Sequence, residues 1–535
     1  MVNLAAEYSQ GSIQFLPGLA DNWTVSSDAS TYTFQLRPNV TFSNGDPLNA
    51  YEVWTDMYTS YYMSGNSTGW LEGYTFFNMT NVNFGPATLT LLNQSSLATP
   101  SQQALSLMGN TTWPIYVVNS DTIAFHLESP FAYFLGTIVT EGGLIYDSQW
   151  VFDNGGLGTP ASPNSYFNQH PIPGTGPYEF SAIAEDNYAQ FVQNPTYWGK
   201  SLNQSQIAAN PALDPGHVKN VIIYYKPDDL ARYTDLASGS VQIAAIQNAD
   251  WNLVQQSPNK YQYTVLPPES GLVTGLAMNV LLYPTNITLV RQAIAHAINY
   301  TQLSQQLFFG QMAPWVGPEY PAWGQYYDLG NFSQYQYNLT LAQQDLTKAN
   351  VSNPTLTYYL EDSCGYCVTR AEIVQSDLAQ IGITVNLDVL TSSNWCAQLC
   401  GSYSTNVANP SAMGNLNDLG GSDWAPGALT PADFWITFVS NTSLTGNGAI
   451  YSNPVVQACV NAFTSLTNTT QIQSMCKTAQ EQIYNDTPYV WFGVMSLWYA
   501  GGSEVWQKGI VSNFYLDPVW TGYDTEPLFN TVTFG

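Results

Sequence analysis

The stretch LPGLADNWTVSSDASTYTFQLRPNVTFSNGDPLNAYEV, residues 16–53, combines a strand, a tight turn and the start of a helix. Within it, TYTFQL (residues 31–36) alternates apolar and polar side chains, the period-two pattern of a half-buried strand. The SNGDP that follows predicts a turn, because Asn and Gly tolerate positive φ and Pro47 has a fixed φ and no N–H to donate. Asn49 is then expected to cap a helix over AYEVWTDMYTSYYM, with Glu52 completing a capping box.

The composition of the whole chain limits its size class and its partners. At 535 residues the chain is too long for one hydrophobic core, so we expect two or three domains. Charged residues make up only 9% of the chain, against about 25% in ordinary soluble proteins. Because 11 basic residues face 38 acidic ones, almost nothing is present to neutralise phosphates, and a nucleic-acid partner is excluded.

Asn-x-Ser/Thr sequons in which x is not Pro are abundant, and chance alone would give about half as many. One interpretation is compositional bias, and the other is a heavily glycosylated exported protein. Low charge also suits an acidic medium, where carboxylates with a pKa near 4 are largely protonated. Our hypothesis is a cell-surface protein of an acidophilic archaeon. The fifteen sequons begin at Asn22, Asn39, Asn66, Asn78, Asn93, Asn110, Asn203, Asn286, Asn299, Asn331, Asn338, Asn350, Asn441, Asn468 and Asn485.

All six cysteines lie in the last third of the chain, in CGYC, in CAQLC and at two later positions. A zinc site built from the first four is one interpretation, and structural disulfides in an exported lobe are the other and the favoured one. Cys459 and Cys476 lie on consecutive predicted helices, so we expect them to pair. We expect the other four to pair between the two motifs, since bridges within one motif constrain little. The six are Cys364, Cys367, Cys396, Cys400, Cys459 and Cys476.

Neither a signal peptide nor a membrane span is visible in the sequence. The first residues, MVNLAAEYSQ, lack a charged region and an apolar core, and no run of about 20 apolar residues occurs. We therefore expect any targeting or anchoring segment to be missing from this chain. Further along, TLTYYL, RAEIVQSDLAQIG and ITVNLDVL read as strand, helix and strand, which predicts an α/β lobe with a right-handed crossover.

Several motifs in order resemble family 5 extracellular solute-binding proteins, the oligopeptide, dipeptide and nickel receptors of ABC importers. The opening stretch resembles the signature region of that family, and GTGPYEF followed by QNPTYWG resembles a second element. VIIYYKPDDLARYTDLASGSVQIA, LAMNVLLYPTNITLVRQAIAHAIN, AEIVQSDLAQIGITVNL and DWAPGALTPADFW follow in the family's order. The resemblance covers nearly the whole chain, although the segment that precedes PGLADNW in family members is short or missing here.

The resemblance implies a two-lobed α/β fold of the periplasmic-binding-protein type (type II, large cluster C) with an extra subdomain. Lobe I would comprise residues 1–20, 165–268 and 488–535, with an inserted subdomain at 21–164. Lobe II would span residues 269–487. The lobes would be joined by crossing strands near SGLVTGLAMN and TPYVWFGV, and closure over a ligand would be read by an importer in the membrane.

Signals for an enzyme are poor, and no catalytic residue, metal site or cofactor is predicted. GNSTG, around Ser67, matches G-x-S-x-G but lies in a polar loop instead of between a strand and a helix. The expected function is therefore an extracellular substrate-binding protein that delivers an oligosaccharide or oligopeptide to an ABC permease. The alternative is a structural cell-surface glycoprotein, a component of the envelope or matrix.

For the ligand, the informative stretch is DWAPGALTPADFW, where peptide-binding relatives read approximately W-x-A-D-Y. The aspartate in that motif holds the peptide's α-amino group, but the position is Gly427 here, and Asp423 is the nearest acidic substitute. Abundant Trp and Tyr suit neutral sugar rings, which favours an oligosaccharide over a peptide. The ligand-binding residues that the resemblance implies are Trp424, Asp423, Gly427, Asn279 and Trp491.

Overall fold

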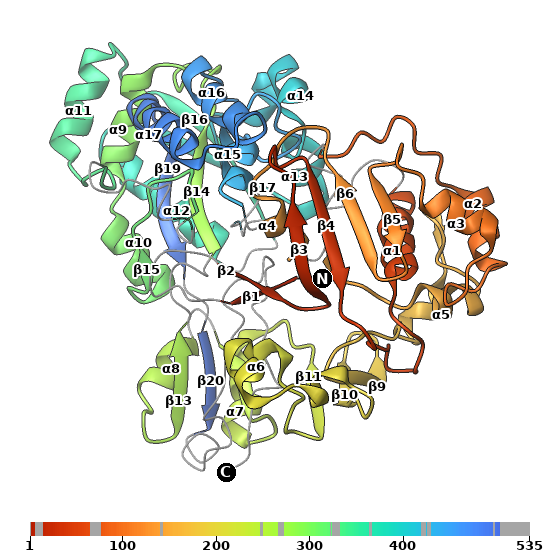
Figure 1. Ribbon diagram of the computed structural model, residues 1–535. Helices are drawn as coiled ribbons and strands as arrows, with labels where there is room; N and C mark the ends of the chain where they lie inside the picture. The colour runs from red at the N-terminus through yellow and green to blue at the C-terminus, as the bar shows by residue number, and fades with distance from the viewer. Residues whose placement is uncertain are drawn as a thin grey trace.

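The structure is a computed structural model of the chain. It describes residues 2–5, 14–64, 76–139, 143–246, 250–265, 272–320, 323, 332–362, 366–418, 424, 430–495 and 498–502. The described elements gather in three groups in Figure 1: a large sheet with many helices, a smaller sheet with five helices, and a group of short sheets near the C-terminal end.

The largest sheet has six strands in the order β15-β19-β14-β18-β16-β17. Its strands are β14 (Leu272–Met278), β15 (Met312–Ala313), β16 (Thr355–Glu361), β17 (Thr384–Leu390), β18 (Leu416–Asp418) and β19 (Tyr489–Met495). β16 is parallel to both β17 and β18, whereas β14 and β19 pair antiparallel at the centre. The predicted strand–helix–strand unit is therefore present as β16, α12 and β17.

Nine helices belong to this group and cover its sheet (Figure 1). They are α9 (Thr288–Ala297), α10 (Tyr300–Phe308), α11 (Leu339–Lys348), α12 (Cys367–Ala379), α13 (Ser392–Leu399), α14 (Tyr403–Ala408), α15 (Ala432–Val439), α16 (Pro454–Phe463) and α17 (Thr469–Asp486). α9 and α10 are separate because Ile298 is extended and the Asn299 side chain caps α10 by accepting from the Gln302 N–H.

The second group is built around a four-stranded sheet in the order β3-β4-β6-β5. Its elements are β3 (Ala20–Val25), β4 (Thr31–Leu36), β5 (Ile115–Asn119), β6 (Thr122–His126), α1 (Ala50–Met63), α2 (Pro86–Asn93), α3 (Gln102–Met108), α4 (Phe134–Ile138) and α5 (Ser148–Asp153). β4 alternates buried and half-buried residues as the sequence predicts. Asn49 caps α1, but the expected capping box is absent because Glu52 points inward and accepts from the Ser148 N–H instead.

The third group contains two three-stranded sheets, β11-β10-β9 and β12-β20-β13. Its elements are β9 (Tyr178–Ala184), β10 (Tyr188–Gln193), β11 (Asn220–Tyr224), β12 (Ile243–Ala245), β13 (Tyr261–Val265), β20 (Trp498–Gly502), α6 (Gln204–Ala209), α7 (Asp229–Ser238) and α8 (Trp251–Gln255). Two short hairpins complete the described strands: β1 (Val2–Ala5) with β2 (Gln14–Pro17), and β7 (Gly158–Thr159) with β8 (Ser162–Pro163). The division into lobes and an inserted subdomain given above stays a prediction.

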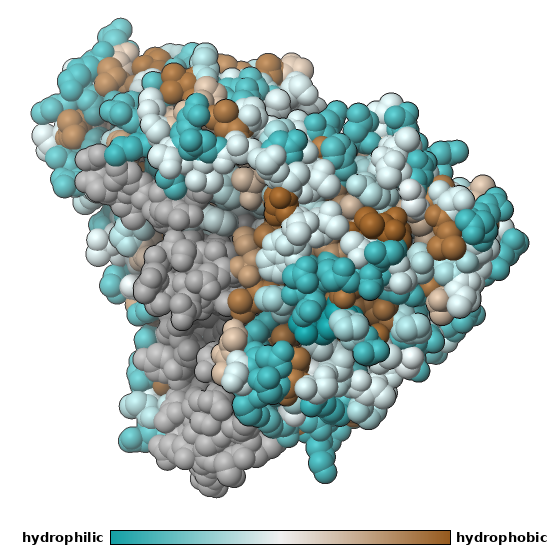
Figure 2. Space-filling view, in the orientation of Figure 1, coloured by the Kyte–Doolittle hydropathy of each residue, from teal (hydrophilic) through white to brown (hydrophobic). Residues whose placement is uncertain are grey.

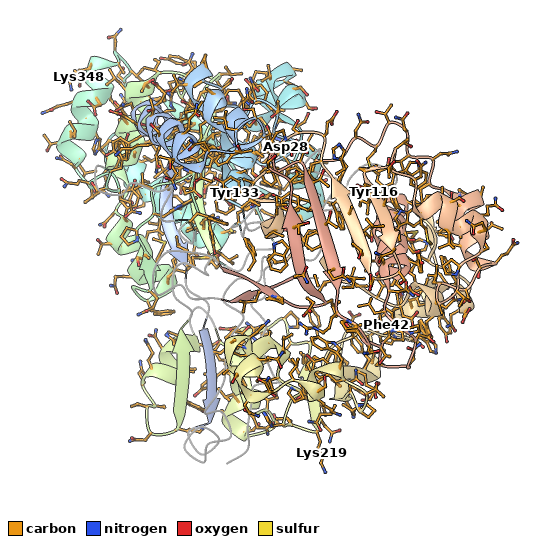
Figure 3. The ribbon with its side chains drawn as sticks, viewed as in Figure 1. Asp28, Phe42, Tyr116, Tyr133, Lys219 and Lys348 are labelled. Carbon is orange, nitrogen blue, oxygen red and sulfur yellow. A yellow bond between two sulfur atoms is a disulfide. The ribbon has the colours of Figure 1, made fainter. Side chains whose placement is uncertain are left out.

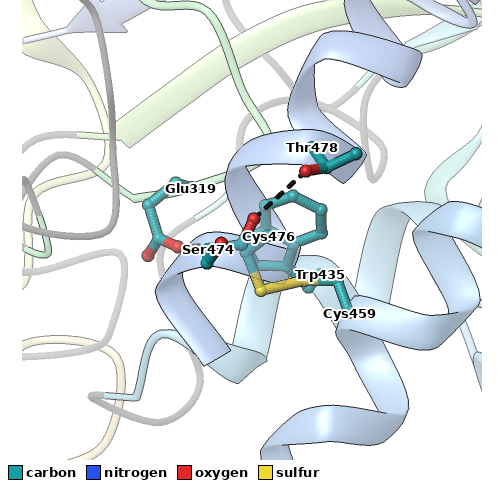
Figure 4. The surroundings of a disulfide bond; sticks show 6 residues. All are labelled: Glu319, Trp435, Cys459, Ser474, Cys476 and Thr478. Carbon is teal, nitrogen blue, oxygen red and sulfur yellow. Dashed lines mark hydrogen bonds between the residues drawn. A yellow bond between two sulfur atoms is a disulfide. The ribbon is translucent and has the colours of Figure 1, made fainter. Parts of the chain in front are cut away.

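The cysteines form disulfides, one of them as expected and one not. Cys459 on α16 is bonded to Cys476 on α17, with a Cα–Cα distance of 4.9 Å (Figure 4). The expected pairing between CGYC and CAQLC is wrong, because Cys396 is bonded to Cys400. Four residues apart at the end of α13, these two side chains lie on the same side of one helical turn. Cys367 is also disulfide-bonded, and Cys364 lies outside the described residues.

Two absences hold for the part of the chain that the structure describes. None of its helices combines the length and the apolar character that crossing a membrane requires. None of its His, Cys, Asp and Glu side chains gather in threes that could hold a metal ion.

Candidate functional site

The central strands of the large sheet carry a cluster of aromatic side chains. Trp491 on β19 stacks on Tyr489, with ring centroids 4.6 Å apart. Its other neighbours include Trp315, at 4.7 Å, and Phe438 of α15, at 6.1 Å. Only 8% of Trp491 is exposed, so most of its surface packs against the protein.

Trp424 belongs to the same cluster through its contact with Phe438. Its backbone N–H and C=O both bond to Val273 of β14 at 2.9 Å, which holds Trp424 alongside the crossing strand. Its half-buried ring meets Phe438 edge-on at 5.7 Å. Phe438 therefore connects the two tryptophans that the sequence selects. Asp423 and Gly427, selected with them, lie outside the described residues.

Asn279, also expected to bind ligand, is fully buried in the protein. Its side-chain amide donates to the Pro410 carbonyl at 2.7 Å and to the Gly414 carbonyl at 2.9 Å. Its carbonyl oxygen accepts from the Leu281 N–H at 3.0 Å. Both donors are used internally, as for a structural residue, and ligand contact by Asn279 stays a prediction.

The apolar core around this aromatic cluster continues into the second group of elements. Tyr133, which follows β6, meets Trp323 edge-on at 6.2 Å and Phe463 of α16 at 6.0 Å. Figure 3 places Tyr133 at the boundary between the β3–β6 sheet and the helices of the large sheet. One apolar core thus runs from the four-stranded sheet to the crossing strands. A ligand held at this boundary would contact both groups.

Sequence reasoning missed Glu319, a fully buried acid in this cluster. Its Oε2 accepts from the Trp435 indole N–H at 2.9 Å, and its main-chain carbonyl accepts from the Trp315 indole N–H at 2.7 Å. Its Oε1 has no hydrogen-bond partner. Figure 4 shows Glu319 and Trp435 beside the Cys459–Cys476 disulfide. The signal in the sequence is a single acid within the aromatic and Pro-rich run APWVGPEYPAW.

A second set of buried acids surrounds the start of α5. Glu52 and Asp56 of α1 accept from the backbone N–H groups of Ser148 and Tyr146, and Asp147 caps α5. Burial, with a smaller contribution from the neighbouring acids, raises the pKa of Glu52 to about 9. Burial also raises the pKa of Asp147 to about 6 and that of Asp56 well above its ordinary value. Glu52 is therefore protonated at neutral pH, and the hydrogen bonds of the three acids hold two helices together.

The exposed surface matches the low charge of the sequence. The face shown in Figure 2 is mostly polar, with apolar side chains interspersed. Of the thirteen sequon asparagines within the described ranges, eleven are exposed, and Asn110 and Asn299 are half-buried. Seven described asparagines are buried, and none of these begins a sequon.

Comparison with known proteins gives consistent matches. A sequence model described as bacterial extracellular solute-binding proteins, family 5 Middle, matches residues 14–446. Di/tripeptide-binding protein 2 of Pseudomonas aeruginosa is 27% identical over 397 residues, which are 72% of this chain and 66% of that protein. Glutathione-binding protein GsiB of Pectobacterium atrosepticum is 24% identical over 510 residues, 94% of this chain and 83% of that protein.

Solved structures extend the likeness to the fold. A putative peptide binding protein, AppA, from Clostridium difficile superposes with a TM-score of 0.74 at 16% identity, over 98% of this chain and 92% of that one. The periplasmic binding protein DppA from Helicobacter pylori, solved in complex with the peptide STSA, gives a TM-score of 0.65 at 19% identity, over 100% and 91%.

Proposed function

Because this chain belongs to the family 5 bacterial extracellular solute-binding proteins and has their two-lobed α/β fold, we propose that it captures a short peptide and delivers it, unaltered, to an ABC importer. The peptide would lie between the lobes, and closure of the lobes would present the loaded form to the permease. The protein would act outside the cytoplasmic membrane. It would need no cofactor for this role.

The observation that carries the proposal is the continuous apolar core, rich in aromatic rings, at the junction of the two sheets. Trp424 borders one crossing strand, Trp491 lies on the other, and Tyr133, which follows β6, belongs to the same apolar core. Ring faces and edges of this kind bury apolar side chains and the flat peptide units between them. A site formed by two sheets can also respond to closure, which a site on one lobe cannot.

The choice of a peptide over a sugar follows the comparisons. The relatives are described as binding di- and tripeptides or glutathione, and one solved structure holds a tetrapeptide. The oligosaccharide expectation rested on abundant Trp and Tyr and on Gly427, which removes one acidic anchor, and it has no support among these relatives. The alternative of a structural surface glycoprotein has no such support either.

Calorimetry tests this proposal. The full chain is titrated with a panel of di- to pentapeptides and with neutral oligosaccharides, at pH 5 and pH 7. We expect at least one peptide to bind with a Kd in the micromolar range or tighter, and the sugars to give no heat. Heat from sugars with none from any peptide would show that the peptide assignment is wrong.

We also propose that the protein is N-glycosylated, as the exposure of its sequons supports. Glycans would keep a surface with few charged residues soluble. This proposal concerns the surface and is independent of the ligand.

A further inference from the structure

The second group of elements packs against the large sheet without a direct chain connection to it. In the order of the described elements, the chain reaches the large sheet from β13 and leaves it for β20, and both strands belong to the third group. The second group is also joined to the third, because the chain runs on from α5 through β7 and β8 to β9. All six cysteines lie outside the second group. The forces that hold the second group against the large sheet are therefore non-covalent.

Towards the third group, the second group makes contacts of fixed geometry. At the start of α5, the Asp147 N–H donates to the carbonyl of Pro173, which shortly precedes β9, at 3.1 Å. Arg37, which follows β4, lies over the ring of Trp198, with 4.9 Å between the guanidinium carbon and the ring centroid. A hydrogen bond and a cation over a ring both depend on the relative orientation of their partners. We therefore expect the second and third groups to move as one body.

Towards the large sheet, the second group presents the buried ring of Tyr133 (Figure 3). This ring meets Trp323 at 6.2 Å and Phe463 at 6.0 Å, both edge-on, and both of these rings are buried as well. Phe463 is the last residue of α16, one turn after Cys459, whose disulfide to Cys476 fixes α16 to α17 (Figure 4). Ring contacts need no donor and acceptor in fixed positions, so they can separate and form again.

We propose that Tyr133 is a latch, a side chain that holds the second group against α16 and so stabilises the closed form of the protein. Because the crossing strands join the third group to the large sheet, opening at those strands separates Tyr133 from Phe463 and leaves the contact of Asp147 with Pro173 intact. This inference rests on the proposed function, in which closure retains the peptide. The strength of the latch then sets how long a captured peptide stays bound.

Small-angle X-ray scattering of the full chain tests the latch without any peptide. Tyr133→Ala should have a larger radius of gyration than the wild type, whereas Tyr133→Phe keeps the ring and should match the wild type. Tyr116→Ala is the matched control, because it removes the same side chain from β5, on the side of the β3–β6 sheet away from the large sheet (Figure 3). Tyr133→Leu replaces the alanine variant if that variant does not fold. An unchanged radius without the ring would overturn the inference.

The dissociation rate of the tightest peptide of the calorimetric panel is the second readout. Loss of two aromatic pairs should speed dissociation from Tyr133→Ala by between about 5-fold and about 150-fold, with little change in the association rate. Adding Phe463→Ala should cause no further increase, because its contact with Tyr133 is already lost.

The two readouts together separate the latch from other roles of Tyr133. Faster dissociation with an unchanged radius of gyration would show that Tyr133 contacts the peptide and is no latch. Equal dissociation from the wild type and Tyr133→Ala would overturn the inference and leave peptide binding intact. Failure of every peptide to bind would remove the proposed function, and scattering would still decide whether the second group separates from α16.

Discussion

At the scale of single residues, position in the fold decides which polar and aromatic side chains are available. Sequence resemblance selected Trp424 and Trp491, and the structure brings both to one aromatic cluster. It also selected Asn279, whose amide is consumed by two backbone carbonyls. Glu319 was not selected, because its one signal in the sequence, a single acid in the run APWVGPEYPAW, does not show that this acid is buried. Residue type and order are visible in a sequence, but burial and hydrogen-bond satisfaction are not.

The two tryptophans should respond differently to replacement by alanine. Trp491→Ala removes a side chain that is only 8% exposed, so the free energy of unfolding should fall by about 3–5 kcal/mol. Trp424→Ala removes a half-buried ring at the edge of the cluster, so it should cost less stability and should weaken peptide binding at least about tenfold. Urea unfolding and calorimetry measure the two effects. Equal loss of stability in both variants would contradict this assignment.

At the scale of elements, the junction between α1 and α5 depends on protons. Glu52 and Asp56 lie one helical turn apart on α1 and both receive backbone N–H groups from the start of α5. With Asp147, they make three acids that are buried together at this junction. The sequence predicted the helix and its cap correctly, but it placed Glu52 in a local capping box. Glu52 accepts from the distant Ser148 N–H instead of the backbone of its own helix, because the N–H groups of residues 146–148 need buried acceptors.

Stability should therefore fall as pH rises. The pKa of Glu52 is about 9 when folded and 4.5 ordinarily, so the folded state holds a proton that unfolding releases. The contribution of this proton to the free energy of unfolding is fully present below pH 4.5 and is lost progressively up to pH 9. Thermal or urea unfolding at pH 5 and pH 8 should show this loss. Glu52→Gln keeps an acceptor for the Ser148 N–H. It should recover on the order of 3 kcal/mol of the free energy of unfolding that the wild type loses between pH 5 and pH 8.

An exposed acid provides the control for this experiment. Glu185→Gln, in the turn between β9 and β10, should leave the wild-type dependence on pH unchanged. A wild-type protein that is equally stable at pH 5 and pH 8 would show that the acids around α5 do not carry the predicted protons.

At the scale of the whole molecule, the α/β class and the family could be predicted from ordered motifs, and the match to residues 14–446 confirms the family. The order of strands in each sheet could not be predicted from the sequence, because it depends on pairings such as β14 with β19, which are more than 200 residues apart. The disulfide between α16 and α17 followed from two adjacent helices. The Cys396–Cys400 bridge could not be predicted, because the sequence does not show where helix α13 ends.

Glycosylation of the sequons would affect the whole surface of the molecule. Protein isolated from its native source should have an intact mass well above the 58.9 kDa of the polypeptide, with glycopeptides at most sequons. Asn194, Asn353 and Asn409 each precede Pro and then Ser or Thr, so they provide internal negative sites that should stay unmodified. Native material with the bare polypeptide mass would show that the sequons are unused.

The positions of β19 and β20 have a consequence for biosynthesis. Residues 489–502 supply an interior strand to two separate sheets, β19 between β15 and β14, and β20 between β12 and β13. On the ribosome, at about 5–20 residues per second, these strands emerge roughly 25–100 s after translation starts. The β3–β6 sheet, formed by residues 20–126, is complete far earlier. The nascent chain therefore carries the β3–β6 and β9–β11 sheets complete while two other sheets still lack an interior strand, and we expect holding chaperones to bind it until its last strands arrive.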